Sequence, residues 1–255
     1  MDRHRFDDVR RVAETDSTNT RLLELARAGG PAGVVLVADH QSAGRGRLGR
    51  RWEAPPGSAL LVSVLLRPEL ALGRAHLLSM AAALAASDAC DALAGLRPPL
   101  KWPNDLVVEE AQGTLKLAGL LAESLVDGGE LRAVVLGMGL NIDAAPAEGA
   151  AALNDHREPG RPPVGRDALL ASWLAHLSPW LDGLESVLAA YRPRCSTLGR
   201  PVRVELADRS FEGRALDVTD DGHLLVETAD GVREVTVGDV VHVRVTDRGP
   251  SPAGP

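Results

Sequence analysis

The stretch Gln41-Ser-Ala-Gly-Arg-Gly-Arg-Leu-Gly-Arg-Arg-Trp52 contains four arginines, three glycines and no acidic residue. The whole chain is acidic, with 35 Asp and Glu against 28 Lys and Arg and a formal net charge of −7. Arginine presents a planar fork of donors to phosphate or carboxylate oxygens, and glycine lets backbone N–H groups approach a ligand. These residue types suit a loop that holds an anion, although charge and glycine content alone would favour a flexible, solvated loop.

Apolar segments on both sides of this stretch indicate where it lies in the fold. Val34–Ala38 precedes it and Ala59–Leu66 follows it, and each has the composition of a buried strand. Residues 41–52, which we call the Gly-Arg loop, are therefore expected to connect two strands. The loop lacks the Gly-Lys-Ser/Thr ending of a Walker A loop, and its glycines do not open a helix as in a dinucleotide fingerprint.

The rest of the chain alternates between helix and strand patterns. Ser17 is a candidate N-cap for a helix that ends at Gly29-Gly30-Pro31. A second helical pattern covers Asp167–Ala190, and we expect Pro179 to kink it or to restart it as another helix. The other predicted elements are a helix over His76–Cys90 and strands over Asp105–Val108, Leu115–Val126 and Leu131–Ile142.

Composition and turn spacing predict one large domain followed by a small one. The 255 residues are 45% hydrophobic but only 3% aromatic, so the core must be built from Ala, Val and Leu. Residues Pro201–Val245 form short alternating segments separated by Asp- and Gly-containing turns, which is typical of a small all-β barrel. We expect a main domain over 1–193, a barrel over 194–247 and a disordered tail over 248–255.

Charge and cysteine content argue against several classes of protein. Broad nucleic-acid binding needs a basic face, which an acidic chain does not favour. The N-terminal residues lack the apolar stretch of a signal peptide, and no run approaches the ~20 apolar residues of a membrane span. Cys90 and Cys195 have no metal-ligand spacing, so we expect two buried thiols, no assigned metal site and a cytoplasmic protein.

Two further segments carry groups that suit an anionic ligand. Lys101-Trp-Pro-Asn-Asp105 places a cation, an amide and a carboxylate at a strand entrance, although Asn-Asp is also an ordinary turn pair. Lys116 lies between Leu115 and Leu117 in an apolar strand. Burying an ammonium is costly unless an anion meets it, but an outward-facing lysine fits this pattern nearly as well.

Two small-residue segments allow both a functional and a structural interpretation. Gly137-Met-Gly-Leu-Asn141 ends a strand with two glycines and an amide, which suits close approach of a ligand or a simple bulge. Ser17-Thr18-Asn19 places three small polar side chains at a helix start, where capping alone would account for them.

The sequences of these segments and their order along the chain resemble those of biotin protein ligases. The resemblance is carried by Glu14–Asn19, the Gly-Arg loop, Lys101–Asp105, Lys116-Leu-Ala-Gly119 and Gly137–Asn141, and it covers roughly residues 12–245. It implies an α+β fold: a class II synthetase-like catalytic domain, with a central mixed or antiparallel sheet and flanking helices, and a small C-terminal SH3-like barrel. Only about a dozen residues precede the first motif, so we expect no helix-turn-helix repressor domain.

The resemblance also implies an activity and a set of site residues. The family forms biotinyl-5′-AMP from biotin and ATP, with Mg²⁺, and passes biotin to one lysine of a biotin carboxyl carrier domain. The catalytic positions matched are Lys116, Arg45, Arg47 and Asp105. The biotin positions are Ser17, Thr18, Asn19, Gln41, Gly44, Arg45, Gly46, Arg47, Lys116 and Gly119. The nucleotide positions are Arg47, Arg50, Trp52, Lys101, Asn104 and Asn141.

The resemblance also bears on the partner of the protein and on two alternative functions. We expect the carrier domain to dock on an exposed strand edge of a monomer or homodimer, and the Gly-Arg loop to close over the adenylate. A lipoate–protein ligase has related chemistry, and a non-catalytic binding protein could use the same scaffold. The Gly-Arg-Gly-Arg and Lys-Trp-Pro-Asn-Asp pair favours biotin, and the complete set of motif residues favours an enzyme.

Overall fold

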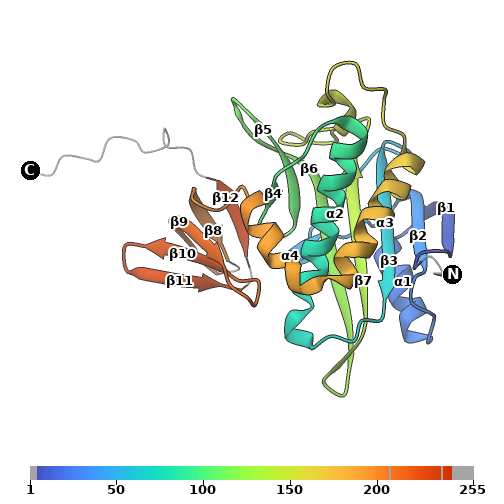
Figure 1. The fold of residues 1–255 in the computed structure, drawn as a ribbon, viewed down its shortest axis with the longest axis horizontal. Helices are drawn as coiled ribbons and strands as arrows, with labels where there is room; N and C mark the ends of the chain where they lie inside the picture. The colour runs from blue at the N-terminus through green and yellow to red at the C-terminus, as the bar shows by residue number, and fades with distance from the viewer. Residues whose placement is uncertain (1–4, 207, 237, 243–255) are drawn as a thin grey trace, which may run out of the picture.

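A computed structural model describes residues 5–206, 208–236 and 238–242, in two units that match the expected fold class (Figure 1). The helices are α1 (Thr18–Arg27), α2 (His76–Ala94), α3 (Arg166–Asp182) and α4 (Leu184–Tyr191). The first seven strands are β1 (Val9–Thr15), β2 (Val35–Gln41), β3 (Ala59–Leu66), β4 (Leu100–Lys101), β5 (Asp105–Glu110), β6 (Gly113–Asp127) and β7 (Glu130–Asn141). The last five are β8 (Pro201–Glu205), β9 (Ser210–Val218), β10 (Leu224–Thr228), β11 (Gly231–Val235) and β12 (Asp239–His242).

The first seven strands form one mixed sheet in the order β1-β2-β3-β7-β6-β5-β4. β1 pairs with β2 in parallel, and every other pair in this sheet is antiparallel. All eight residues of β3 are buried, because this strand lies inside the sheet with helices over both faces. The centre of the sheet is thus formed by β3, β7 and β6, and the last two of these strands carry the glycine motifs.

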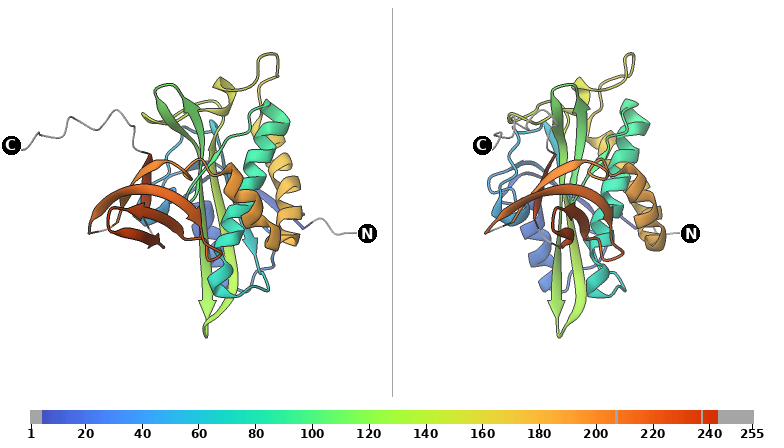
Figure 2. Two further views of the ribbon diagram at one scale, coloured as in Figure 1. Left: turned by 60° about the vertical axis from the view of Figure 1, so that its left-hand side comes forward. Right: turned by 90° about the vertical axis from the view of Figure 1, so that its left-hand side faces the viewer.

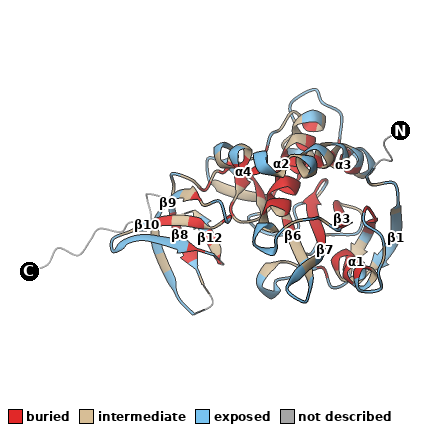
Figure 3. Cartoon of the chain, turned by 60° about the horizontal axis from the view of Figure 1, so that its bottom comes forward, coloured by how far each residue is buried: buried red, intermediate tan, exposed pale blue. Residues whose placement is uncertain are grey.

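The two faces of the sheet bury different helices. α2 and α3 pack together on one face, and α1 covers part of the other (Figure 2). The alternation of β7 shows the division, because Val134 and Leu136 join the α2 core while Ala133 and Val135 pack with α1. Buried residues gather where α2 and α3 meet the sheet (Figure 3). This arrangement leaves the sheet face beyond the N-terminus of α1 available for a pocket.

The C-terminal unit is a five-stranded antiparallel sheet in the order β11-β10-β9-β8-β12, as the turn pattern predicted. It packs against the main unit through Trp102, whose indole N–H donates to the carbonyl of Gly222 at 3.0 Å. The Trp102 backbone N–H donates to the Thr197 hydroxyl, also at 3.0 Å. The small unit therefore lies directly against the Lys-Trp-Pro-Asn-Asp segment. The expected tail, 248–255, falls outside the described residues.

Two expectations about the elements were wrong or incomplete. α3 runs through Pro179, and the break falls at Gly183 instead. Since Pro179 lies near the C-terminal end of α3, the backbone bond that it removes is followed by only three more helical residues. β1 was not predicted, because its sequence Val-Arg-Arg-Val-Ala-Glu-Thr is polar and lies at the edge of the sheet.

The segment Leu72–Ala94 is long and apolar enough to cross a membrane, with a mean hydropathy of 1.4 in its most apolar window. The expectation that no run approaches a membrane span was therefore wrong for this segment, in which serines and aspartates lie between the apolar residues. In the structure 72% of that window is buried, and α2 forms the centre of the core. Cys90 and Cys195 are free, buried thiols, as expected. Burial raises the pKa of Cys90 to about 12, so this thiol is unreactive at neutral pH.

Candidate active site

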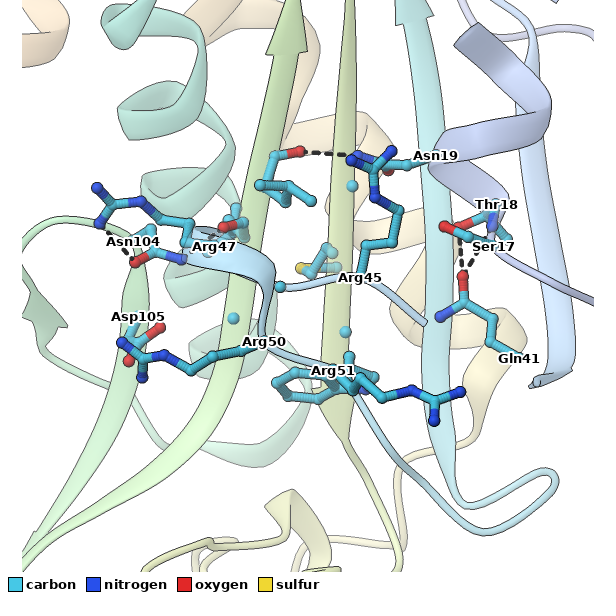
Figure 4. Close-up of a pocket in the computed structure, with 18 of the residues that line it drawn as sticks. Ser17, Thr18, Asn19, Gln41, Arg45, Arg47, Arg50, Arg51, Asn104 and Asp105 are labelled. Carbon is cyan, nitrogen blue, oxygen red and sulfur yellow. Dashed lines mark hydrogen bonds between the residues drawn. The ribbon is translucent and has the colours of Figure 1, made fainter. Parts of the chain in front are cut away.

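A pocket on the α1 face of the sheet gathers most of the predicted site residues (Figure 4). Ser17, Thr18 and Gln41 lie at one end, Asn104 and Asp105 lie at the other, and the Gly-Arg loop passes between them. Thirteen predicted residues line it: Ser17, Thr18, Asn19, Gln41, Arg45, Gly46, Arg47, Arg50, Trp52, Asn104, Asp105, Lys116 and Gly119. Segments as far apart in the sequence as Ser17 and Gly119 therefore meet at one site.

Three glycines form the base of this pocket, and we call Gly119, Gly137 and Gly139 the glycine floor. Gly119 and Gly139 are directly paired across β6 and β7, and Gly137 lies on the same face of β7 two residues earlier. A Cβ at Gly139 would lie 2.3 Å from the Trp52 ring, and one at Gly137 would lie 2.1 Å from the Asn19 carboxamide oxygen. The glycines thus make room for protein side chains, and because they also line the pocket, close approach of a ligand stays a prediction.

The N-terminus of α1 forms the polar end of the pocket. Ser17 occupies the N-cap position, as predicted, but its hydroxyl makes no capping hydrogen bond. The Gln41 side chain takes that role, because its Oε1 accepts the Thr18 backbone N–H at 2.7 Å. Ser17 and Thr18 are 2% and 3% exposed, so their polar groups are held away from bulk water. Capping therefore does not account for the Ser17 hydroxyl, which favours a role in ligand binding.

A buried serine on β3 orders this polar end. Ser63 is fully buried, and its Oγ lies 2.6 Å from Asn19 Oδ1 and 2.7 Å from Thr18 Oγ1. Since a serine hydroxyl has one proton and the Asn19 oxygen only accepts, Ser63 donates to Asn19. The Thr18 hydroxyl lies 2.7 Å from Ser63 Oγ and 3.0 Å from Gln41 Oε1, and it donates its single proton to one of these two oxygens. Sequence analysis missed Ser63, and the available signal was a single hydroxyl in the otherwise apolar strand Ala-Leu-Leu-Val-Ser-Val-Leu-Leu.

The cationic end of the pocket contains Lys116 and Asp105. Lys116 Nζ lies 2.7 Å from Asp105 Oδ1 and 5.6 Å from the centre of the Trp52 ring. The Lys116 side chain is 38% exposed, so this strand lysine points into the open pocket rather than into the core. Its backbone N–H donates to the Gly149 carbonyl at 2.7 Å. A carboxylate and an aromatic face therefore hold an accessible ammonium over the glycine floor.

The arginines of the Gly-Arg loop differ in how they are paired. Arg45 Nη1 lies 2.9 Å from Glu123 Oε1, and Arg50 forms an ion pair with Asp239 from β12 of the C-terminal unit. Arg47 has no carboxylate within 4.0 Å among the described residues, and its Nη1 lies 3.4 Å from Asn104 Oδ1. Burial lowers the pKa of Arg47, although the guanidinium stays charged at neutral pH.

The structure leaves three predicted residues outside the pocket. Gly44 lies at the neck of the loop, where a Cβ would be 2.4 Å from the Trp52 carbonyl oxygen. Lys101 on β4 lies opposite Asp105 on β5 in the strand register, and burial lowers the pKa of the Lys101 ammonium. Asn141 is buried, and its amide N–H donates to the Ala151 carbonyl at 3.1 Å.

Acidic groups around the pocket were also missed from the sequence. Glu123 and Asp239 each form an ion pair with a loop arginine, but both belong to segments of ordinary composition.

The lysine content of the chain was a simpler signal for the site, because Lys101 and Lys116 are the only two lysines in the chain. Both fall in the segments singled out above. Over the described ranges, no group of three or more His, Cys, Asp and Glu side chains gathers in a metal-binding arrangement.

The mixed sheet, the cationic pocket and the appended β unit define a class II synthetase-like catalytic fold with a small C-terminal barrel. The chain belongs to the biotin/lipoate A/B protein ligase family, whose model matches residues 12–141. A second family model, the biotin protein ligase C terminal domain, matches residues 197–243. The family membership inferred from the sequence motifs is therefore confirmed.

Individual relatives agree with this assignment. The biotin–[acetyl-CoA-carboxylase] ligase of Mycobacterium tuberculosis is 39% identical over 253 residues, covering 91% of this chain and 88% of the relative. The biotin protein ligase from Aquifex aeolicus, solved with biotin and ATP, is 27% identical with a TM-score of 0.76, over 94% of this chain and all of that chain. The Leishmania major enzyme, solved with biotinyl-5-AMP, is 26% identical with a TM-score of 0.64, over 91% and 99% of the two chains.

Proposed function

We propose that this chain is a biotin–[acetyl-CoA-carboxylase] ligase that forms biotinyl-5′-AMP and transfers biotin to a lysine of a biotin carboxyl carrier domain. The observation that carries the proposal is the pocket, in which a polar, hydrogen-bonding end and a cationic end lie on either side of the glycine floor. Biotin offers a ureido ring for the first and a carboxylate for the second. The biotin-specific C-terminal model favours this substrate over lipoate.

The first half-reaction brings two anions together, and the pocket cations suit it. The biotin carboxylate oxygen attacks the α-phosphorus of ATP, an O–P bond forms, and pyrophosphate leaves. Lys116 and Arg47 are the cations that we place nearest the two reacting groups, with Arg45 at the biotin side and Arg50 at the nucleotide side. Ser17, Thr18 and Gln41 bind the ureido ring, and Trp52 forms the wall between the two substrates.

The second half-reaction needs a neutral amine and a carboxylate that receives or orients its proton. The acceptor lysine nitrogen bonds to the biotinyl carbon, the acyl–oxygen bond breaks, and AMP leaves. Asp105 is the pocket carboxylate that we assign to this step, because it lies against Lys116 at the same end of the pocket. We place three further residues near the nucleotide: Lys101, Asn104 and Asn141. Of these three, only Asn104 lines the pocket.

Mg²⁺ suits this site as a companion of the ATP phosphates. Proteins bind this ion through one or two carboxylates plus the substrate phosphates, and Asp105 and Asp239 are the carboxylates that line the pocket. The ion would neutralise phosphate charge during transfer. We further propose that 1–193 is the catalytic domain and 194–247 the barrel, and that the chain works in the cytoplasm as a monomer or homodimer.

The proposed function is tested by incubating the protein with MgATP, labelled biotin and a biotin carboxyl carrier domain. We expect label on the acceptor lysine, and none on a carrier with that lysine changed to arginine. Lipoate should neither compete nor raise the Tm as biotin does. Label transfer from lipoate instead would assign a lipoate ligase, and biotin binding without transfer would indicate a non-catalytic binding protein.

Gly139→Ala tests the role of the glycine floor. The new methyl group would collide with the Trp52 ring, and overpacking of this kind costs about 1–3 kcal/mol. We expect the KM for biotin to rise by about tenfold or more. Gly165→Ala is the matched control, because no atom lies within 4 Å of the position that its methyl group would take. Equal biotin-dependent ATP–pyrophosphate exchange in both variants would contradict this role.

A further inference from the structure

We propose that Glu123 is a positioning residue that fixes both the Gly-Arg loop over the biotin pocket and the polar end of that pocket; this inference rests on the proposed function. Glu123 lies on β6, and its side chain is 18% exposed. One carboxylate oxygen lies 2.9 Å from Arg45 Nη1 on the Gly-Arg loop. The other accepts a hydrogen bond from Asn19 Nδ2 at 2.9 Å. One side chain therefore joins two segments that meet at the pocket.

Both N–H groups of the Asn19 side chain are used by contacts within the protein. Its amide nitrogen donates to Glu123 Oε2 and to the Leu121 carbonyl, at 2.9 and 3.3 Å, and its oxygen accepts from Ser63. An asparagine amide has two N–H groups, and both are used within the protein. Asn19 thus has no N–H group left to donate to biotin, and its contacts hold this end of the pocket in place. Gly137 provides the space in which this amide lies against the sheet.

The contacts of Glu123 extend to the groups that we expect to bind the ureido ring. Asn19 orients Ser63, and Ser63 lies 2.7 Å from the Thr18 hydroxyl. Asn19, Ser63 and Thr18 are each at most 4% exposed, so a lost partner is not replaced readily by bulk water. A change at Glu123 is therefore transmitted to Thr18 through three hydrogen bonds, which join Glu123 to Asn19, Asn19 to Ser63 and Ser63 to Thr18.

The pair with Arg45 acts on the loop rather than on overall stability. The Arg45 side chain is 48% exposed, and an ion pair this open contributes little to folding. Arg45 lies between two glycines, however, and such a backbone has many conformations to lose when the loop closes. By holding Arg45 against β6 before the ligand arrives, Glu123 lowers the ordering cost of binding.

Two variants separate the two contacts. Glu123→Gln keeps an oxygen that can accept from Asn19 but loses the charge that pairs with Arg45, whereas Glu123→Ala loses both. We expect Glu123→Gln to release biotinyl-AMP several-fold faster and to bind biotin within about threefold of wild type. We expect Glu123→Ala to release the adenylate as readily and, in addition, to weaken biotin binding by about 10- to 100-fold.

Asp127→Asn, an exposed carboxylate further along β6, is the matched control and should behave as wild type in both measurements. Calorimetry with biotin alone gives the affinity, and filtration of preformed adenylate gives the release rate. Wild-type values for both variants would overturn the proposal. If Glu123→Ala does not fold, unchanged adenylate release by folded Glu123→Gln overturns the loop contact. Biotin binding by the wild type without adenylate formation would contradict the proposed function while leaving the Glu123 test intact.

Discussion

Lys116→Ala is expected to lower biotin-dependent ATP–pyrophosphate exchange by about 100- to 1,000-fold or more, the range seen when a group that stabilises developing charge is removed. Lys116 provides an accessible ammonium at the cationic end, where the biotin carboxylate and the α-phosphate must meet. The substitution also leaves Asp105 without its cation, so a carboxylate would face the incoming anions. Both effects act on adenylate formation.

The fold should survive this change, because the structural contacts of Lys116 use its backbone. Its N–H donates to Gly149, and its carbonyl accepts from Ala151 at 2.9 Å. Lys116→Arg is the matched variant, since it keeps the charge but changes the shape and reach of the donor. We expect the Tm of Lys116→Ala to stay near that of wild type. Exchange at the wild-type rate in Lys116→Ala would remove Lys116 from the reaction.

The sequence predicted the buried elements well because their signals are local. Ala59–Leu66 was predicted with its observed bounds, since an apolar run of this length, interrupted only by Ser63, matches a strand buried on both faces. The helix break near residue 180 was placed four residues too early, because the rule for proline concerns helix interiors and Pro179 lies in the last turns of α3. β1 was missed because its pairing with β2 is non-local and its side chains are largely exposed.

The site was predicted as a set of segments, and the structure supplied their relations. Lys116 could be outward-facing or buried by sequence alone, and the observed pocket explains both its apolar neighbours and its exposure. Ser63, Glu123 and Asp239 could not be selected from the sequence. Their partners lie 44, 78 and 189 residues away, so only strand register and domain packing bring them together.

The C-terminal unit also contributes to the pocket, which the sequence did not indicate. Asp239 lines the pocket and pairs with Arg50, and Trp102 anchors the unit next to Asn104 and Asp105. Three of the pocket cations, Arg45, Arg50 and Lys116, are therefore already paired with carboxylates before any substrate binds. Arg47 and Arg51 lack such a partner among the described residues. Since Arg51 donates to the Ser42 carbonyl at 2.7 Å, Arg47 is the loop cation that we expect to hold the adenylate phosphate.

Arg47→Gly is accordingly expected to release biotinyl-AMP about 10- to 100-fold faster than wild type, because the contact between a partly buried guanidinium and the phosphate is lost. Free adenylate should then accumulate, and it should biotinylate amines on unrelated proteins added to the reaction. The measurement is the dissociation rate of preformed, labelled adenylate on rapid gel filtration. Lysine labelling of an unrelated protein provides a second readout.

A glycine substitution also adds backbone freedom to the loop, and Leu48→Gly controls for this effect. Leu48 has a φ of 54°, a left-handed conformation that glycine adopts without strain, and its side chain is exposed. Leu48→Gly therefore adds a fourth glycine to the loop while keeping all four arginines. We expect it to retain the adenylate nearly as well as wild type. Equal leakage from both variants would assign retention to loop stiffness, whereas leakage from Arg47→Gly alone assigns it to the guanidinium.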